Sequence, residues 1–429
     1  MLDTIKEILD KKDISFWTIN ESISKSEEVF LIKNKTDLSR ITDVHEFEVN
    51  VYKDFEDNGN KTTSSGTVTI GISESKEEIE KKIDELIYSL NFVKNEAYTF
   101  SFDPVQKTFP KNELKKLRDS FRDIYDVIYK DYKTKSKVNS IEIFLYNKDN
   151  RVLNKSGVDV KYSSSKLVFE LVTENNLGSE PVEIFRGYEI LDIDLKRIEE
   201  ITKNQLEETD ARAIAVRNNK ISGIDVILSG DDVEDFFSFF LTKTSASSIY
   251  EKLSDVKIGD KMLDDNAKTK LNIKLDPNLS HSPYRRPVDS DGTLLNEVNI
   301  MENGKILNLS ATQRYASYLD IKATGDIQTF TVGGGEKPIE DFKKGDYLEI
   351  LHFSSFNLDP FTGDFGGEFR LAKLVQDGKV SFVTGGSISE NIMNLRNDFY
   401  ISKETENRLK SKAPKAVIFK NLTVGGIEK

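Results

Sequence analysis

The chain has 429 residues, of which 37% are hydrophobic, and its 61 basic and 73 acidic residues give a formal net charge of −12. This length exceeds one typical compact unit, so we expect two domains, and the apolar fraction excludes a disordered composition. An acidic chain repels the phosphate backbone, which argues against direct binding of nucleic acid.

The chain contains no cysteine, which excludes disulfides, a thiolate nucleophile and cysteine-ligated metal. Residues 1–9 mix acids with apolar residues at helical spacing, unlike the basic start and unbroken apolar stretch of a signal peptide. No segment approaches the roughly 18 apolar residues that a membrane helix needs. We therefore expect a cytoplasmic protein that does not enter a membrane.

The first half of the chain predicts strands followed by helices. Phe47, Val49 and Val51 alternate with polar residues, which is typical of a strand with one buried face, and residues 66–72 pair with it as a hairpin. Two amphipathic helices follow, with apolar stripes at Ile79, Ile83, Leu86, Ile87 and Leu90, and at Leu114, Leu117, Phe121, Ile124 and Ile128.

Further strands are expected as an antiparallel meander at residues 141–146, 157–162, 167–172 and 182–187. A helix at about 194–208 closes this unit. We therefore place an N-terminal domain, an antiparallel sheet with packed helices, at residues 1–204.

Residues 205–429 are expected to form a β-rich, barrel-like C-terminal domain. Residues 211–216 and 224–229 look like strands, and a helix opens at Gly230 with acids in its first turn, where the helix dipole favours them. After about residue 270, short strands and turn residues dominate. The fold class predicted for the whole chain is α+β.

Few residues in the chain suit metal or acid-base chemistry. The three histidines, His45, His281 and His352, are far apart in sequence, and none is followed by a second histidine at the spacing of a helical zinc motif. We interpret His45 as an exposed strand residue, His352 as a strand residue that packs locally, and His281 as a loop residue. Asp289-Ser-Asp-Gly-Thr293 fails the calcium-loop pattern and predicts a tight turn.

An acidic run at Asp231, Asp232, Glu234 and Asp235 has two interpretations. The favoured one is the solvated start of a helix, and the alternative is an acid-base pair of the kind that hydrolases use.

Three segments together resemble the TldD/PmbA family: Asp289–Thr293, the Gly-rich run Asn357–Phe369 with the following strand, and residues 416–426. That family contains zinc peptidases and metal-free partners, and its older name is modulator of DNA gyrase. Its peptidase branch, TldD, carries an HExxxH helix after a strand of the type seen at 224–229, and a cysteine that also binds zinc. Here the matching helix begins Asp231-Asp-Val-Glu-Asp and lacks both histidines, so the sequence is similar to the PmbA branch, also called TldE.

The resemblance implies a non-catalytic subunit of a metallopeptidase complex that degrades or trims unfolded peptides. It implies no catalytic or metal-binding residue and no cofactor in this chain, with zinc only in a TldD-like partner. The expected partners are a TldD-like subunit or a second copy, and an extended peptide. Residues proposed for the peptide cleft are Asp291, Gly292, Thr362, Gly363 and Asp364. For the turn that contains residues 362–364, a purely structural role is the favoured interpretation and a place in the cleft is the alternative. Two alternatives stay open: a stand-alone peptide-binding homodimer, and a hydrolase that uses the acidic run or an unrecognised metal site.

Overall fold

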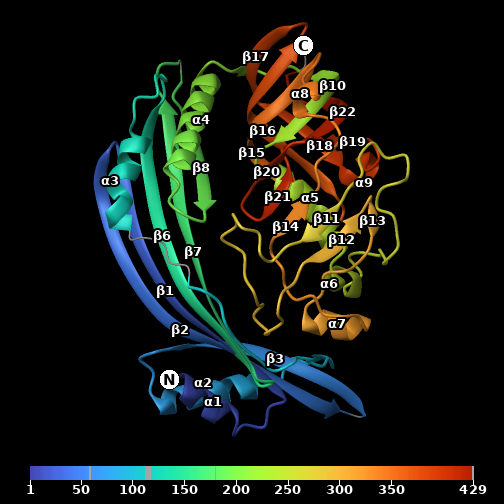
Figure 1. The fold of residues 1–429 in the computed structure, drawn as a ribbon. Helices are drawn as coiled ribbons and strands as arrows, with labels where there is room; N and C mark the ends of the chain where they lie inside the picture. Colours follow the sequence, from blue (N-terminus) through green and yellow to red (C-terminus); the bar gives the residue numbers. More distant parts are fainter. Residues whose placement is uncertain (58, 112–116, 179, 428–429) are drawn as a thin grey trace.

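A long, curved and mainly antiparallel sheet dominates the first half of the chain (Figure 1), in a computed structural model that describes residues 1–57, 59–111, 117–178 and 180–427. The strand order is β4-β3-β2-β1-β6-β7-β5, and β8 pairs with β7. The strands are β1 Phe16–Ile32, β2 Lys35–Asp57, β3 Asn60–Gly71, β4 Asn95–Glu96, β5 Val105–Thr108, β6 Lys137–Asn154, β7 Val158–Asn175 and β8 Val182–Ile190.

The predicted alternation and hairpin are confirmed in β2 and β3. Phe47, Val49 and Val51 are fully buried, and Phe47 lies opposite Ile70 of β3. The antiparallel meander of β6, β7 and β8 is also confirmed. The alternation of apolar and polar residues predicted these strands correctly, because one face of each strand is buried.

Two pairs of helices cover opposite ends of the sheet (Figure 1). They are α1 Leu2–Leu9 with α2 Lys76–Ser89, and α3 Leu117–Ile128 with α4 Leu195–Ala213. Both predicted stripes face a core, with Ile79 and Ile83 buried in α2 and Ile124 and Ile128 buried in α3, whereas Leu114 lies outside the described residues.

Helix α4 begins after its N-cap Asp194, as expected, but it continues to Ala213. The strand predicted at 211–216 is therefore wrong over its first half, and β9 covers only Val216–Arg217. Alanine favours helix strongly, and Ala211 is buried as part of α4, so the helix continues through this segment. The domain boundary at residue 205 falls within α4 and stays a prediction.

The second half is rich in strands, which with the helices confirms the α+β class. One sheet has the order β19-β22-β10-β15-β16-β17-β9, with β18 on β16, and the other has the order β13-β12-β11-β14-β21-β20. The first comprises β9, β10 Ile221–Ser229, β15 Tyr347–Leu358, β16 Asp364–Gln376, β17 Lys379–Thr384, β18 Gly386–Asn391, β19 Phe399–Ile401 and β22 Ala416–Val424. The second comprises β11 Ile273–Leu275, β12 Val298–Glu302, β13 Lys305–Ile306, β14 Phe330–Val332, β20 Thr405–Asn407 and β21 Ser411–Pro414.

Helix α5 packs in the common core of these two sheets. Its apolar residues Val233, Phe236, Phe237, Phe239 and Phe240 are all fully buried. The bounds of the helices in this half are α5 Asp232–Lys243, α6 Ala246–Tyr250, α7 Gln313–Leu319, α8 Ile339–Phe342 and α9 Ile392–Leu395. None of the helices within the described residues combines the length and apolar character that crossing a membrane requires.

Candidate functional site

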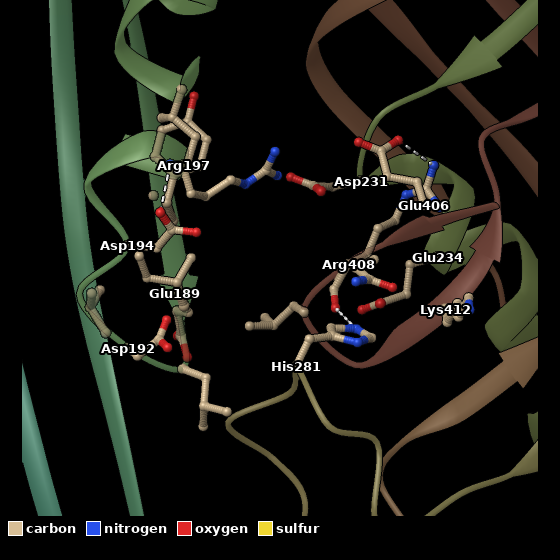
Figure 2. Close-up of a pocket in the computed structure, with 18 of the residues that line it drawn as sticks. Glu189, Asp192, Asp194, Arg197, Asp231, Glu234, His281, Glu406, Arg408 and Lys412 are labelled. Atoms are coloured by element: carbon tan, nitrogen blue, oxygen red, sulfur yellow. Dashed lines mark hydrogen bonds and ion pairs between the residues drawn. The ribbon is translucent and has the colours of Figure 1, made fainter. Parts of the chain in front are cut away.

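A cavity of about 1140 Å³ lies between the two halves of the chain (Figure 2). One wall comes from β7, β8 and the start of α4. The other comes from the start of α5, the loop at Ser280 and His281, and residues 405–412. Because the walls belong to different sheets, the cavity exists only while the two halves are packed together.

The first wall includes the last strand on this side of the N-terminal sheet. Residues 187–190 of β8 line the cavity, and a side chain built at Gly187 would meet no atom within 4 Å. Asp194 caps α4 by accepting the backbone N–H groups of Lys196 and Arg197, and the Arg197 side chain extends across the cavity toward Asp231 (Figure 2). This wall therefore offers open space beside a strand, and one cation.

The second wall is held to the start of α5 by polar contacts. Glu234 Oε2 accepts the backbone N–H of Lys410 at 2.9 Å and the hydroxyl of Ser411 at 2.7 Å. Arg408 is buried, and its Nε donates to the carbonyl of Gly230 at 2.7 Å. The turn between β20 and β21 is therefore held against the start of α5 by the hydrogen bonds of Glu234 and Arg408.

Two carboxylates at the start of α5 have raised pKa values. Burial, followed by repulsion from Asp235 and Asp231, raises the pKa of Asp232 to about 7. Burial and the neighbouring Glu234 also raise the pKa of Asp235. Asp232 is therefore about half protonated at neutral pH, which is the state that general acid-base chemistry uses.

The donor groups at this cavity do not fit a zinc site. His281 Nε2 lies 3.0 Å from the carbonyl oxygen of Arg408 and 3.1 Å from that of Ser411, so this nitrogen is a donor and not a ligand. Glu234 is already engaged by Lys410 and Ser411, and Glu406 pairs with the Arg408 guanidinium at 3.4 Å. Across the described residues, no group of three or more His, Cys, Asp or Glu side chains is arranged to hold a metal ion.

The remaining histidines lie away from such chemistry. His45 is half-buried in β2 rather than exposed, with Nε2 2.9 Å from Glu21 Oε1, because the neighbouring strand β1 covers it. His352 lies in β15 as predicted, where burial and then the charge of Arg186 lower its pKa to about 4. His352 is therefore neutral at pH 7.

The predicted cleft residues fall into two groups in the structure. The turn predicted at Asp289 is confirmed, with Asp289 Oδ1 accepting the backbone N–H groups of Asp291, Gly292 and Thr293. Asp291 is half-buried against the N-terminal sheet, where Tyr52 donates to its Oδ1 at 3.3 Å and loss of solvent raises its pKa to about 6. Gly292 lines a second cavity, of about 1470 Å³.

Thr362, Gly363 and Asp364 form the turn between β15 and β16, and they do not line the cavity of Figure 2. Thr362 and Asp364 are exposed, and Asp364 accepts hydrogen bonds from Thr362 Oγ1 at 2.8 Å and from Asn391 Nδ2 at 2.7 Å. A Cβ at Gly363 would lie 3.0 Å from the Phe239 ring of α5, which explains the glycine. Their role in a peptide cleft stays a prediction.

Sequence reasoning missed several residues of the cavity. The sequence analysis did not single out Arg197 or Glu189, and it interpreted His281 as a loop residue. For the second wall, the only signal in the sequence was the acidic run at the start of α5. The first wall faces it only because the two halves of the chain pack together.

The fold and the cavity define a two-part α+β protein with a cavity between its two halves. Residues 222–426 match the PmbA/TldA metallopeptidase C-terminal domain. The C-terminal half of the chain therefore carries a domain of the TldD/PmbA family.

Solved structures share the whole fold at low sequence identity. TldE from Thermococcus kodakarensis has 15% identity and a TM-score of 0.78, and the match covers 99% of this chain and 100% of that one. A protein described as a modulator of a DNA gyrase from Thermotoga maritima has 16% identity and a TM-score of 0.79, with 99% and 100% covered. One of the same description from Bacteroides thetaiotaomicron has 14% identity and a TM-score of 0.75, with 99% and 98% covered. A sequence comparison with curated proteins found no match.

Proposed function

We propose that this chain is a TldE-like, non-catalytic subunit of a zinc metallopeptidase complex that degrades or trims unfolded peptides. The observation that carries the proposal is the composition of α5, the helix that corresponds to HExxxH in the TldD branch. Here the first turn of α5 is acidic, and its later turns carry phenylalanines that are buried in the core. The zinc of the complex would belong to a TldD-like partner.

The cavity between the two halves would hold an extended segment of the peptide. Extended peptides commonly bind by adding a strand to a sheet, with main-chain hydrogen bonds giving affinity. Strand β8 pairs with β7, and its residues 187–190 line the cavity, so this strand offers a place for such pairing. The acid-lined interior also makes nucleic acid an unfavourable ligand.

The test is proteolysis of a casein-like substrate by each subunit alone and by both together. We expect no cleavage by this chain alone, less than one tenth of a zinc ion per chain after purification, and at least tenfold faster cleavage when a cognate HExxxH subunit is added to it than by that subunit alone. Stoichiometric zinc that survives mild chelation, or robust cleavage by the isolated chain, would contradict the proposal.

One observation favours a second candidate, a hydrolase that uses the acidic run. The raised pKa of Asp232 supplies a carboxylic acid at neutral pH, beside the ionisable Asp235. Under this alternative, Asp232→Asn abolishes a hydrolytic activity of the isolated chain. Under our proposal the substitution leaves the activity of the reconstituted complex within about twofold.

Asp232→Asn should also stabilise the chain in a pH-dependent way. The folded pKa of about 7 lies above the ordinary 3.8, so the folded state holds an extra proton between these values and loses stability as the pH rises through them. We expect Asp232→Asn to be neutral near pH 4 and to raise the free energy of unfolding by about 2–4 kcal/mol at pH 8. Urea unfolding at both pH values measures this, and a pH-independent difference would contradict the raised pKa.

The turn at 362–364 gives a separate test of the peptide cleft. Because Thr362 and Asp364 are exposed, their joint replacement by alanine should cost no more than about 1 kcal/mol. If the turn contributes to the cleft, peptide degradation by the reconstituted complex falls several-fold per folded complex. Unchanged degradation would restrict the turn to a structural role.

A further inference from the structure

Strand β2 has an open edge beyond the end of β3. It pairs with β1 from Lys35 to Tyr52, whereas β3 pairs with it only from Glu46 to Asp57. Within the described residues, positions 35–45 therefore have a strand partner on one side only. Figure 1 shows this edge on the side of the sheet that faces away from the C-terminal half.

The open edge exposes apolar side chains. Ile41 is 76% exposed, Leu38 is 49% exposed and Val44 is 47% exposed. Natural edge strands usually point charges outward to prevent pairing with another chain. Here Arg40 turns back onto β1, where its Nε lies 2.6 Å from Glu28 Oε2. The edge is therefore less protected against pairing with another chain than its sequence suggests.

We propose that this edge pairs with the same edge of a second copy of this chain. The two strands would run antiparallel over residues 37–45, with Ile41 on the two-fold axis, as a closed and symmetric dimer requires. In this register Leu38 faces Val44 and Ile41 faces its own copy. Asp37 faces His45, so apolar residues meet on both faces and the end pairs are compatible in charge.

Two neighbouring registers are less favourable. Centring the pair on Arg40 places Arg40 opposite Arg40 and Asp37 opposite Asp43, which are like charges. Centring it on Ser39 brings Lys35 opposite Asp43, but it places Ile41 opposite Asp37. The register centred on Ile41 alone combines matched apolar pairs with no directly opposed like charges.

The proposed function and this inference both involve a second chain. The inference goes further, because it specifies the surface on which two copies of this chain meet. A TldD-like subunit could bind elsewhere. The two ideas therefore have separate tests: proteolysis with an HExxxH subunit tests the function, and self-association of the isolated chain tests the edge.

The absence of cysteine allows a direct cross-linking experiment on the full chain. Opposed residues of antiparallel strands have Cα atoms about 4.5–5.5 Å apart, which is within the range of a disulfide. Under mild oxidation, Ile41→Cys should form at least tenfold more covalent dimer than Ile258→Cys, a control at an isoleucine of the C-terminal half that is 54% exposed. Ser39→Cys or Arg40→Cys cross-linking in place of Ile41→Cys would overturn the register.

Sedimentation then tests the interface without a cross-link. The wild-type chain should be a dimer at tens of micromolar, and Ile41→Lys should raise its dissociation constant at least tenfold while Ile258→Lys leaves it unchanged. Because both sites are exposed, the melting temperatures should match that of the wild type at low concentration. A wild-type monomer, or a dimer indifferent to Ile41→Lys, would overturn the inference.

Discussion

Phe236→Ala should lower the free energy of unfolding by about 3–5 kcal/mol, because it removes a large side chain from the centre of the C-terminal core. The Phe236 ring is fully buried within α5. Its centroid lies 5.2–6.3 Å from five other phenylalanine rings: Phe237, Phe240, Phe365, Phe399 and Phe419. These rings come from α5 and from strands β16, β19 and β22, so one cavity would disturb contacts to several elements at once.

Ser238→Ala is the matched control on the same helix. Ser238 is not buried, and its hydroxyl donates to the Asp235 carbonyl one turn earlier. Its replacement should change stability by no more than about 0.5 kcal/mol. Urea unfolding of both variants measures the difference. A loss below about 1 kcal/mol for Phe236→Ala would mean that α5 is not a core helix, and would weaken the argument that it has lost a metal-binding role.

The strands of the N-terminal half could be predicted from sequence because one face of each is buried. Phe47, Val49 and Val51 alternate in the sequence and lie on the buried face of β2. The same rule failed at residues 211–213, which continue helix α4. Alternation of alanine with larger residues is a weak indication of a strand, because alanine fits both strands and helices and favours helices.

The candidate site was less predictable, because its walls join distant segments. Glu234 bonds to Ser411, 177 residues later, and His281 bonds to the carbonyl of Arg408, 127 residues later. No local pattern encodes such contacts. The acidic run was interpreted as a solvated helix start, which fits the exposed Asp231 but not Asp232, whose pKa is raised chiefly by burial.

Arg186→Met should lower the free energy of unfolding by about 2–4 kcal/mol, because it leaves a half-buried carboxylate without its partner and removes a contact with the C-terminal half. Arg186 of β8 lies 2.7 Å from Glu208 of α4, and its Nη2 donates to the Leu351 carbonyl of β15 at 2.9 Å. This side chain therefore connects the N-terminal sheet to the C-terminal half close to the cavity. Methionine keeps much of the volume but removes the charge and both contacts.

The origin of the loss can be separated by pH and by a second substitution. Burial already raises the pKa of Glu208, and the charge and the hydrogen bond of Arg186 oppose it. Without Arg186 that pKa rises further, so the deficit of Arg186→Met should grow as the pH increases from 5 to 8. The double variant Arg186→Met/Glu208→Gln should recover at least about half of the loss, because it removes the unpaired charge as well. A double variant no more stable than Arg186→Met would show that the contact with Leu351, rather than the ion pair, holds the two halves of the chain together.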